Sequence, residues 1–536
     1  MQKPNKTLRT VLICVVALVA VVAIGRIVVG QVAQKKVREA LTQIPGVRLD
    51  VKSMSFSLIA GSLDLRDVEF EVSDSTNADQ QLKGRIDAIM LDGISWRKLM
   101  KGEAHADRLT IRKPVAQVVL SENAPEKKAE AEKAPADTSF LKRVSLSELR
   151  IEKASVDMSQ GAALKASVKE FSASLQDIGL NLPDGSLEFN DSTYTVSLDS
   201  LDFSENTSFT RVQVGHLATA NAGPVEGLGV RAYTTVTPDQ MAVKMGKVSV
   251  MWMDVKLDSL STSAINIPRI IKDKNIAIES MRLAAPDIVL VQNDRYPPKV
   301  PYPTLQEGLN TLDMPLNINK IDASIKNFVF KWETKPENIG SLPMKNVRLA
   351  LESVSNAPGN TLKLGMRLSE KGLGQWNYTL YVKNDKKEST SGKMLIKNLD
   401  PATMDSFLRP LFGATAKADI HQIDLSFKGD KNKMTADFCM TYDNMSIKAW
   451  DDASAPFSFV AKNSGAVTFL ANAVLPKSNP TRAGKDPKKV EYGFERDPML
   501  PYPSYLISAL TNGMLHTVLP GKSVKKNKTN KTNKTK

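Results

Sequence analysis

Apolar and polar residues alternate along most of this chain, starting after residue 46. Within residues 47–58 every second position is apolar, with a one-residue change of phase between Val51 and Met54. A period of two is typical of a β-strand with one buried face, and the change of phase predicts a β-bulge. The same alternation predicts strands at residues 193–203, 228–236, 241–257, 316–332, 362–368, 376–382, 392–396, 418–427 and 434–448.

Helical spacing is confined to a few segments. Residues 400–413 place apolar side chains at i, i+3, i+4 and i+7, with Asp400 as a candidate N-cap and Gly413 at the end. Residues 502–521 are amphipathic but interrupted by Gly513. This second segment predicts either a terminal helix docked on the sheet or a helix on a membrane surface.

Two stretches of the chain resemble each other. Residues 109–120 read LTIRKPVAQVVL and residues 281–292 read MRLAAPDIVLVQ, and their prolines, Pro114 and Pro286, are 172 positions apart (286 − 114). A repeat of this kind indicates a duplicated structural unit. We therefore expect a mainly β fold, with elongated, curved antiparallel sheets built from a duplicated unit and a few short helices.

Composition divides the chain further. Charged, Ala/Pro-rich and lysine-rich segments without periodicity predict linkers and tails. The expected divisions are a cytoplasmic N-terminus (1–10), a transmembrane anchor (11–30), a stalk helix (31–46), the first part of repeat 1 (47–120), a disordered linker (121–139), strands that complete repeat 1 and open repeat 2 (140–291), a proline-rich linker (292–304), a C-terminal β module (305–475), a loop (476–489), an amphipathic helix region (490–521) and a disordered lysine-rich tail (522–536).

The N-terminal apolar run predicts a membrane anchor. Residues 11–30 are interrupted by a single charge, Arg26, and 20 helical residues match a hydrocarbon core of about 30 Å. Arg26 can extend its charge to the interface. A cleavable signal peptide is the alternative, but the run lacks a clear small-x-small cleavage site. The anchor residues we select are Val11, Leu18, Val22, Arg26 and Val29.

The formal charge of +14 lies at the two ends of the chain. Residues 1–38 and residues 522–536 each carry seven basic residues and no acid, which leaves residues 39–521 without net charge (14 − 7 − 7). A nucleic-acid-binding domain would carry basic charge on its folded surface, so nucleic acid is not expected as a partner. Basic residues flank the anchor on both sides, and the positive-inside rule favours a cytoplasmic N-terminus.

The sequence offers little material for catalysis. It contains no P-loop, GxSxG or CxxC motif, and its histidines stand singly. We therefore predict no catalytic, cofactor-binding or metal-binding residues, and a protein that is not an enzyme. The isolated candidates are His105, His216, His421, His516, Cys14 and Cys439.

A long sheet with one apolar face must cover that face. It can close on itself as a sandwich or barrel, or it can curl into a trough that shields acyl chains. Alternation is the same in both arrangements, so both stay open at this point.

The chain resembles the AsmA-like family of bacterial envelope proteins, related in style to TamB and to the bridge-like lipid-transfer proteins. The resemblance includes a strand–short helix–strand element that ends before a proline. It implies a β-rich periplasmic body tethered to the cytoplasmic membrane, with a role in phospholipid movement or outer-membrane homeostasis. This chain is short beside family members thought to bridge the periplasm. The segments that carry the resemblance are 47–72, 92–120, 266–291, 398–430, 435–450 and 494–522.

Together these observations predict a single-pass protein of the inner membrane whose bulk is periplasmic. Its expected partners are the cytoplasmic membrane and phospholipid acyl chains, which the apolar sheet face would handle in support of outer-membrane assembly. The alternative is a non-enzymatic periplasmic scaffold that binds protein partners or cell-wall polymer. The sequence does not name a protein partner.

Overall fold

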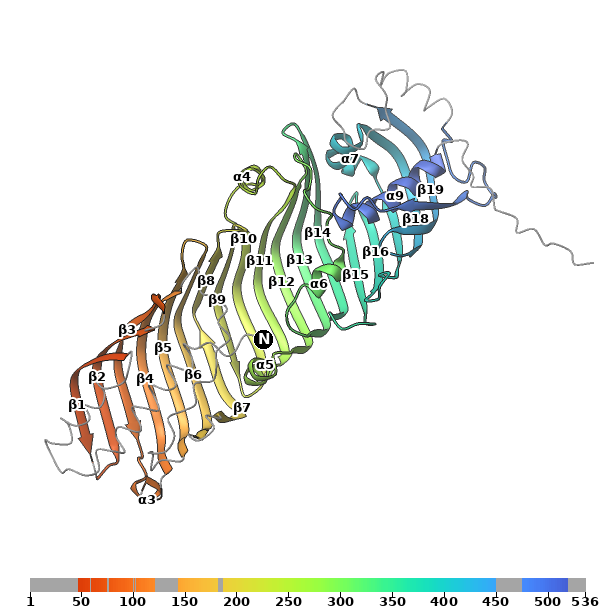
Figure 1. The fold of residues 1–536 in the computed structure, drawn as a ribbon. Helices are drawn as coiled ribbons and strands as arrows, with labels where there is room; N and C mark the ends of the chain where they lie inside the picture. Colours follow the sequence, from red (N-terminus) through yellow and green to blue (C-terminus); the bar gives the residue numbers. More distant parts are fainter. Residues whose placement is uncertain are drawn as a thin grey trace, which may run out of the picture. The chain divides into compact units, whose positions relative to one another are not determined.

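The computed structural model describes residues 47–57, 59–74, 77–99, 101, 103–120, 143–181, 187–449 and 475–518. These residues form two compact units. Unit 1 contains the described residues up to Arg231 together with Ala264–Arg269, and unit 2 contains Ala232–Ser263 and the described residues from Ile270 onward. Both units consist mainly of β-strands that lie side by side (Figure 1), which confirms the mainly β fold class.

Unit 1 is a sheet of long strands in which most hydrogen-bonded neighbours are also neighbours in sequence. β7 and β8 together take the place of one strand, because both pair with β6 on one side and with β9 on the other. The elements are β1 (Val47–Ser57), β2 (Ser62–Asp74), β3 (Asn77–Asp92), α3 (Trp96–Leu99), β4 (Glu103–Leu120), β5 (Arg143–Gln160), β6 (Leu164–Asn181), β7 (Leu187–Leu198), β8 (Ser200–Glu205), β9 (Thr210–Ala220) and β10 (Pro224–Thr234), whose last residues belong to unit 2.

Unit 2 adds helices to the same strand pattern. Its elements are α4 (Pro238–Lys244), β11 (Val250–Ala264), α5 (Ile267–Asp273), β12 (Ile276–Asn293), α6 (Leu305–Asn310), β13 (Leu316–Lys335), β14 (Asn338–Ser355), β15 (Thr361–Glu370), β16 (Gly374–Lys383), β17 (Thr390–Leu399), the 3-10 helix η2 (Pro401–Met404), α7 (Asp405–Phe412), β18 (Ala414–Gly429), β19 (Lys433–Ala449), β20 (Lys489–Glu495) and α9 (Tyr502–Val518). β11 and α5 extend across the division between the units.

The pairing is mixed, which corrects the expectation of a purely antiparallel sheet. β4 pairs with β5 in parallel, and so does β12 with β13. Both registers join residues 40 positions apart, as in Glu103 with Arg143 and Ile276 with Leu316. A parallel pair forms because the chain returns to the starting end before it begins the next strand. The sequence pattern does not predict these parallel pairs, because a period of two does not report strand direction.

The repeated prolines lie inside strands. Pro114 belongs to β4 and Pro286 to β12, so neither strand ends before its proline. A proline cannot donate to the ladder of hydrogen bonds, and it is tolerated where the ladder is irregular. The parallel pairing of β4 with β5 omits Pro114, and that of β12 with β13 omits Pro286.

The change of phase at the start of the first repeat is not a bulge. Val51 pairs with Val68 and Met54 with Leu65, and the sum of the paired residue numbers stays at 119. No extra residue is therefore inserted. Both strands change phase at the same level, where Asp67 has a φ of 50°. Residues with positive φ recur in neighbouring strands as Lys113, Lys153 and Glu170.

One predicted strand is partly wrong. Residues 241–257 alternate, but the structure ends α4 at Lys244 and begins β11 at Val250. The reason is a capping box: the Thr237 side chain accepts from the Gln240 backbone N–H, and the Gln240 side chain accepts from the Thr237 N–H. This local signal starts a helix with Pro238 in its first turn.

Both predicted C-terminal helices are present. The Asp400 side chain accepts from the Ala402 N–H at 3.0 Å and caps η2. η2 is followed directly by α7, whose C-cap is Gly413 with a φ of 64°. α9 continues through Gly513 and packs on β18, β19 and β20. The structure therefore favours a helix docked on the sheet over one on a membrane surface.

No helix among the described residues is long and apolar enough to cross a membrane. The predicted anchor lies outside the described residues, as do the stalk helix, the linker at 121–139 and the lysine-rich tail. The anchor residues in question are Val11, Leu18, Val22, Arg26 and Val29.

Tyr194 links β7 to the segment before α5 within unit 1. Its side chain is 2% exposed, and its hydroxyl donates to the Ile265 carbonyl at 2.8 Å and accepts from the Ile267 N–H at 3.0 Å. We expect Tyr194→Phe to lower the free energy of unfolding by about 1–3 kcal/mol, because both backbone groups lose their hydroxyl partner.

Urea denaturation of the purified chain, combined with hydrogen exchange of the Ile267 amide, measures this effect. Tyr381 on β16 is 41% exposed and provides the matched control, since Tyr381→Phe should change stability by less than about 0.5 kcal/mol. Equal effects of the two substitutions would contradict the role assigned to the Tyr194 hydroxyl.

Candidate functional site

The most extensive functional candidate is an apolar face on the sheet of unit 1. The strand registers align apolar side chains into rows that cross from strand to strand. Two adjacent rows define what we call the apolar strip. The first row is Val72, Leu82, Val118, Met158, Ala166, Phe203 and Val212, and the second is Leu49, Phe70, Ala116, Val156, Val168, Leu201 and Val214.

The apolar strip is only partly buried. Leu82 and Val214 are 8% exposed, and the other strip side chains are all half-buried. The rows farther along the same face behave differently. Leu65 and Leu109, for example, are 0% exposed. The face thus combines a buried band, which stabilises the fold, with a strip that still presents hydrocarbon to its surroundings.

Gly84 is the one position in the strip without a side chain. It pairs with Phe70 on β2 and with Ala116 on β4. A Cβ atom at Gly84 would lie 2.7 Å from Cζ of Phe70, so the phenyl ring occupies the space above the glycine backbone. The ring therefore keeps the surface apolar at this point.

The opposite face of the same strands is charged. Arg108 on β4 contacts Glu148 on β5 at 2.7 Å, and Arg112 contacts Glu152 at 3.3 Å. Arg150 also reaches Glu148 at 2.7 Å. Burial opposes ionisation of Glu148, but hydrogen bonds from the two arginines outweigh it and hold the pKa of that carboxyl below its usual value. The sheet of unit 1 is therefore amphipathic across its thickness.

Helices cover the apolar side differently in the two units. In unit 2, α9 buries Tyr505 and Ala509, and α7 packs on β13, β14 and β18. In the part of unit 1 that the structure describes, α3 is the helix that packs on these strands, near the start of β4. The strip crosses β4 at Ala116 and Val118, near the other end of that strand. Among the described residues, the strip is thus a half-buried apolar surface away from the helix that packs on unit 1.

The strip is long enough for acyl chains. Its second row crosses the positions of β1 to β6, β8 and β9, and strands are spaced about 4.8 Å apart, so this row extends roughly 34 Å along the sheet, and the first row, which begins on β2, about 29 Å. A bilayer core of about 30 Å holds two opposed acyl chains. The strip offers hydrocarbon contact without an ionisable side chain, an arrangement suited to desolvating apolar chains.

The sequence-derived candidates for chemistry are not brought together. His105 lies on β4, His216 on β9, His421 on β18 and His516 on α9, and burial lowers the pKa of His105. Within the described ranges there is no group of three or more His, Cys, Asp or Glu side chains placed to hold a metal ion. The ring nitrogens contact Ser145 at 2.8 Å (His105), Asp199 at 2.7 Å (His216) and Asp443 at 2.9 Å (His421).

Of the two cysteines, the structure describes one. Cys439 on β19 is a free thiol, and burial raises its pKa. Cys14 lies outside the described residues. The residues of the apolar strip were not selected from the sequence, because alternation marks apolar positions without showing which of them a packed core buries.

Comparison with protein-family models and with curated proteins finds no match for this chain.

Proposed function

We propose that this chain is a membrane-anchored envelope protein of the AsmA-like kind, whose periplasmic β-body binds phospholipid acyl chains on the apolar strip. The observation that carries the proposal is the strip itself: two adjacent rows of mostly half-buried apolar side chains in unit 1. Support for the anchor comes from the apolar run at residues 11–30 and its basic flanks. The bound lipid would be passed along the strip or held there during outer-membrane assembly.

The hydrophobic effect sets the scale of this binding. Removal of one methylene from water contributes about 0.8 kcal/mol, so ten methylenes seated on the strip contribute roughly 8 kcal/mol before the cost of ordering the chain. The contacts are not directional, because dispersion and desolvation depend on area rather than on hydrogen bonds. Such a surface would accept acyl chains of different lengths and let them slide.

Site-specific photo-crosslinking in membranes tests the proposal. A benzophenone amino acid replaces one residue at a time: Val118 or Phe203 on the apolar strip, or Val119 as the control. Val119 is the next residue of β4, faces the opposite side and is 40% exposed. After irradiation of cells that express the full chain, mass spectrometry of the purified protein identifies the adducts. We expect phospholipid adducts at Val118 and at Phe203, and at least tenfold fewer at Val119.

A second variant makes the test independent of the probe. Met158→Glu places a charge in the first row of the strip, and it should lower the phospholipid adducts at Phe203 several-fold, because a carboxylate is costly in a hydrocarbon contact. Protein adducts at Val118 without lipid adducts would favour the scaffold alternative. Equal lipid adducts at Val118 and Val119 would overturn the assignment of the strip.

A further inference from the structure

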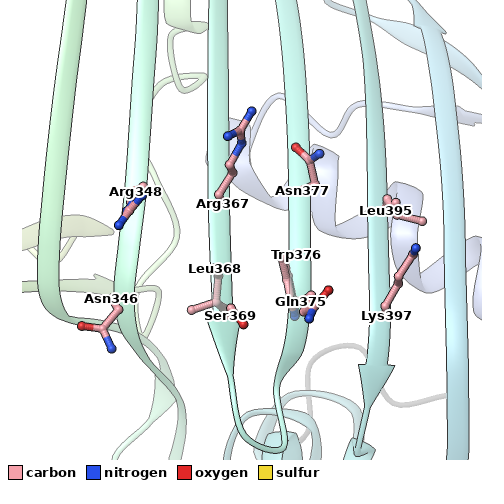
Figure 2. A pocket seen from close by; sticks show the side chains of 10 residues that line it. All are labelled: Asn346, Arg348, Arg367, Leu368, Ser369, Gln375, Trp376, Asn377, Leu395 and Lys397. Carbon is pink, nitrogen blue, oxygen red and sulfur yellow. The ribbon is translucent and has the colours of Figure 1, made fainter.

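A second candidate site lies on the polar face of unit 2. There the middle strands line an open hollow of about 530 Å³, whose side chains Figure 2 labels. Its walls come from four neighbouring strands, β14 to β17, and two of the lining residues, Leu368 and Trp376, also belong to the apolar core. The lining residues are Asn346, Arg348, Arg367, Leu368, Ser369, Gln375, Trp376, Asn377, Leu395 and Lys397.

The lining is cationic. It contains Arg348, Arg367 and Lys397, and no acidic residue. Arg348 on β14 is directly paired with Arg367 on β15. Like charges directly opposite each other destabilise a sheet. Figure 2 shows the two arginines on neighbouring strands.

Several other cations on polar faces of the protein pair with nearby acids. On the same two strands Lys363 contacts Glu352 at 2.8 Å, four residues along each strand from the arginine pair. Arg348, Arg367 and Lys397 make no such ion pair with any residue that the structure describes. Three cations without an ion-pair partner among the described residues therefore meet at the hollow.

The nearest acids in the adjoining positions already serve other groups. Glu370, at the end of β15, accepts from the backbone N–H of Lys345 at 2.8 Å. Asp424 on β18, opposite Leu395, accepts from the Gln422 side chain at 2.5 Å.

We propose that this hollow binds a soluble, extended anion that carries two or more phosphate-type groups. One group lies at the paired Arg348 and Arg367, whose guanidinium forks match phosphate oxygens, and a second lies at Lys397. β14 and β17 are three strand spacings apart, or about 14 Å, which is too far for one phosphate to span. The Ser369 hydroxyl and the Asn377 amide supply hydrogen bonds between the two ends.

This inference is independent of the proposed lipid function. It concerns the polar face of unit 2, whereas the apolar strip lies in unit 1 and presents hydrocarbon. Either proposal can fail without the other. The alternative source of phosphate is a lipid headgroup at a membrane surface, and the experiment separates that source from a soluble anion.

Calorimetric titration of the full chain in non-ionic detergent is the test, with inorganic tripolyphosphate and orthophosphate as probes. We expect tripolyphosphate to bind at least tenfold more tightly than orthophosphate. The double variant R348Q/R367Q should lose at least tenfold of the tripolyphosphate affinity. K397Q should weaken tripolyphosphate several-fold and leave orthophosphate unchanged, because only the longer anion reaches Lys397.

The matched control is K363Q, which removes one positive charge from the same face of β15. It should change either affinity by less than twofold, and the lysine-rich tail contributes the same background in every variant. Equal affinities in the control and the double variant would overturn the proposal. So would binding of phosphatidylglycerol vesicles that depends on Arg348 and Arg367 without binding of tripolyphosphate.

Stability provides a readout that a purely structural role would not give. Without ligand and at low salt, R367Q should raise the urea midpoint, because it removes the repulsion with Arg348. With saturating tripolyphosphate the order should reverse, since the wild-type chain gains the binding free energy. A lower midpoint for R367Q in both conditions would contradict an anion site.

Discussion

Leu109→Ala should lower the free energy of unfolding of unit 1 by about 3–4 kcal/mol. Leu109 lies in the middle of β4 and is 0% exposed. It pairs with Leu91 on β3 and with Leu149 on β5, so its side chain belongs to the buried band of the apolar face. Truncation removes the transfer free energy of three carbon atoms and leaves a cavity that neighbouring strands cannot fill without breaking their ladders.

Urea denaturation followed by hydrogen exchange in β3, β4 and β5 measures this loss. Val119→Ala is the control on the same strand, because Val119 is 40% exposed on the other face and should change stability by less than about 0.5 kcal/mol. A similar small loss for Leu109→Ala would mean that the buried band does not hold unit 1 together.

Gly513→Ala should destabilise unit 2 by about 2 kcal/mol, although alanine is the better helix former. A Cβ atom at Gly513 would lie 2.3 Å from Cδ2 of Phe438 and 2.8 Å from the Tyr492 hydroxyl oxygen. Phe438 is 2% exposed in the core of unit 2, so its ring has no free volume into which to move. The glycine lets α9 approach β19 closely, and overpacking forces the helix away from the sheet.

Gly308→Ala is the matched control, since Gly308 lies in α6 and its added Cβ would meet nothing within 4 Å. This control should stabilise the protein by up to about 1 kcal/mol through helix propensity alone. Thermal denaturation of both variants, with proteolysis to detect release of α9, distinguishes the two outcomes. A gain in stability for Gly513→Ala would show that the helix does not depend on the close contact.

The period of two was sufficient to predict many strands of this fold. Residues 434–448 alternate cleanly and form β19. The same rule failed at residues 241–249, because the capping box at Thr237 and Gln240 decides the local structure there. Side-chain capping signals, weighed before periodicity, would have predicted the helix α4.

Other features depend on register, which no local pattern contains. Arg348 and Arg367 lie opposite each other because β14 pairs with β15 in this register. No motif or spacing in the sequence distinguishes either arginine from the other basic residues. The same holds for the apolar strip: Val118 and Leu109 are both apolar positions of β4, but one is half-buried and the other fully buried. Direction of pairing is likewise invisible, since a parallel and an antiparallel neighbour require the same alternation.

The two parallel pairings have a consequence for the order in which the chain assembles. Hairpins such as β2–β3 join residues as close as Asp74 and Asn77, whereas every contact between β4 and β5 spans 40 positions. Closing the longer loop costs more chain entropy and slows pairing. We therefore expect β1–β4 and β5–β9 to fold as separate nuclei and the β4–β5 pair to form last. In unit 2, the β12–β13 pair should likewise form late.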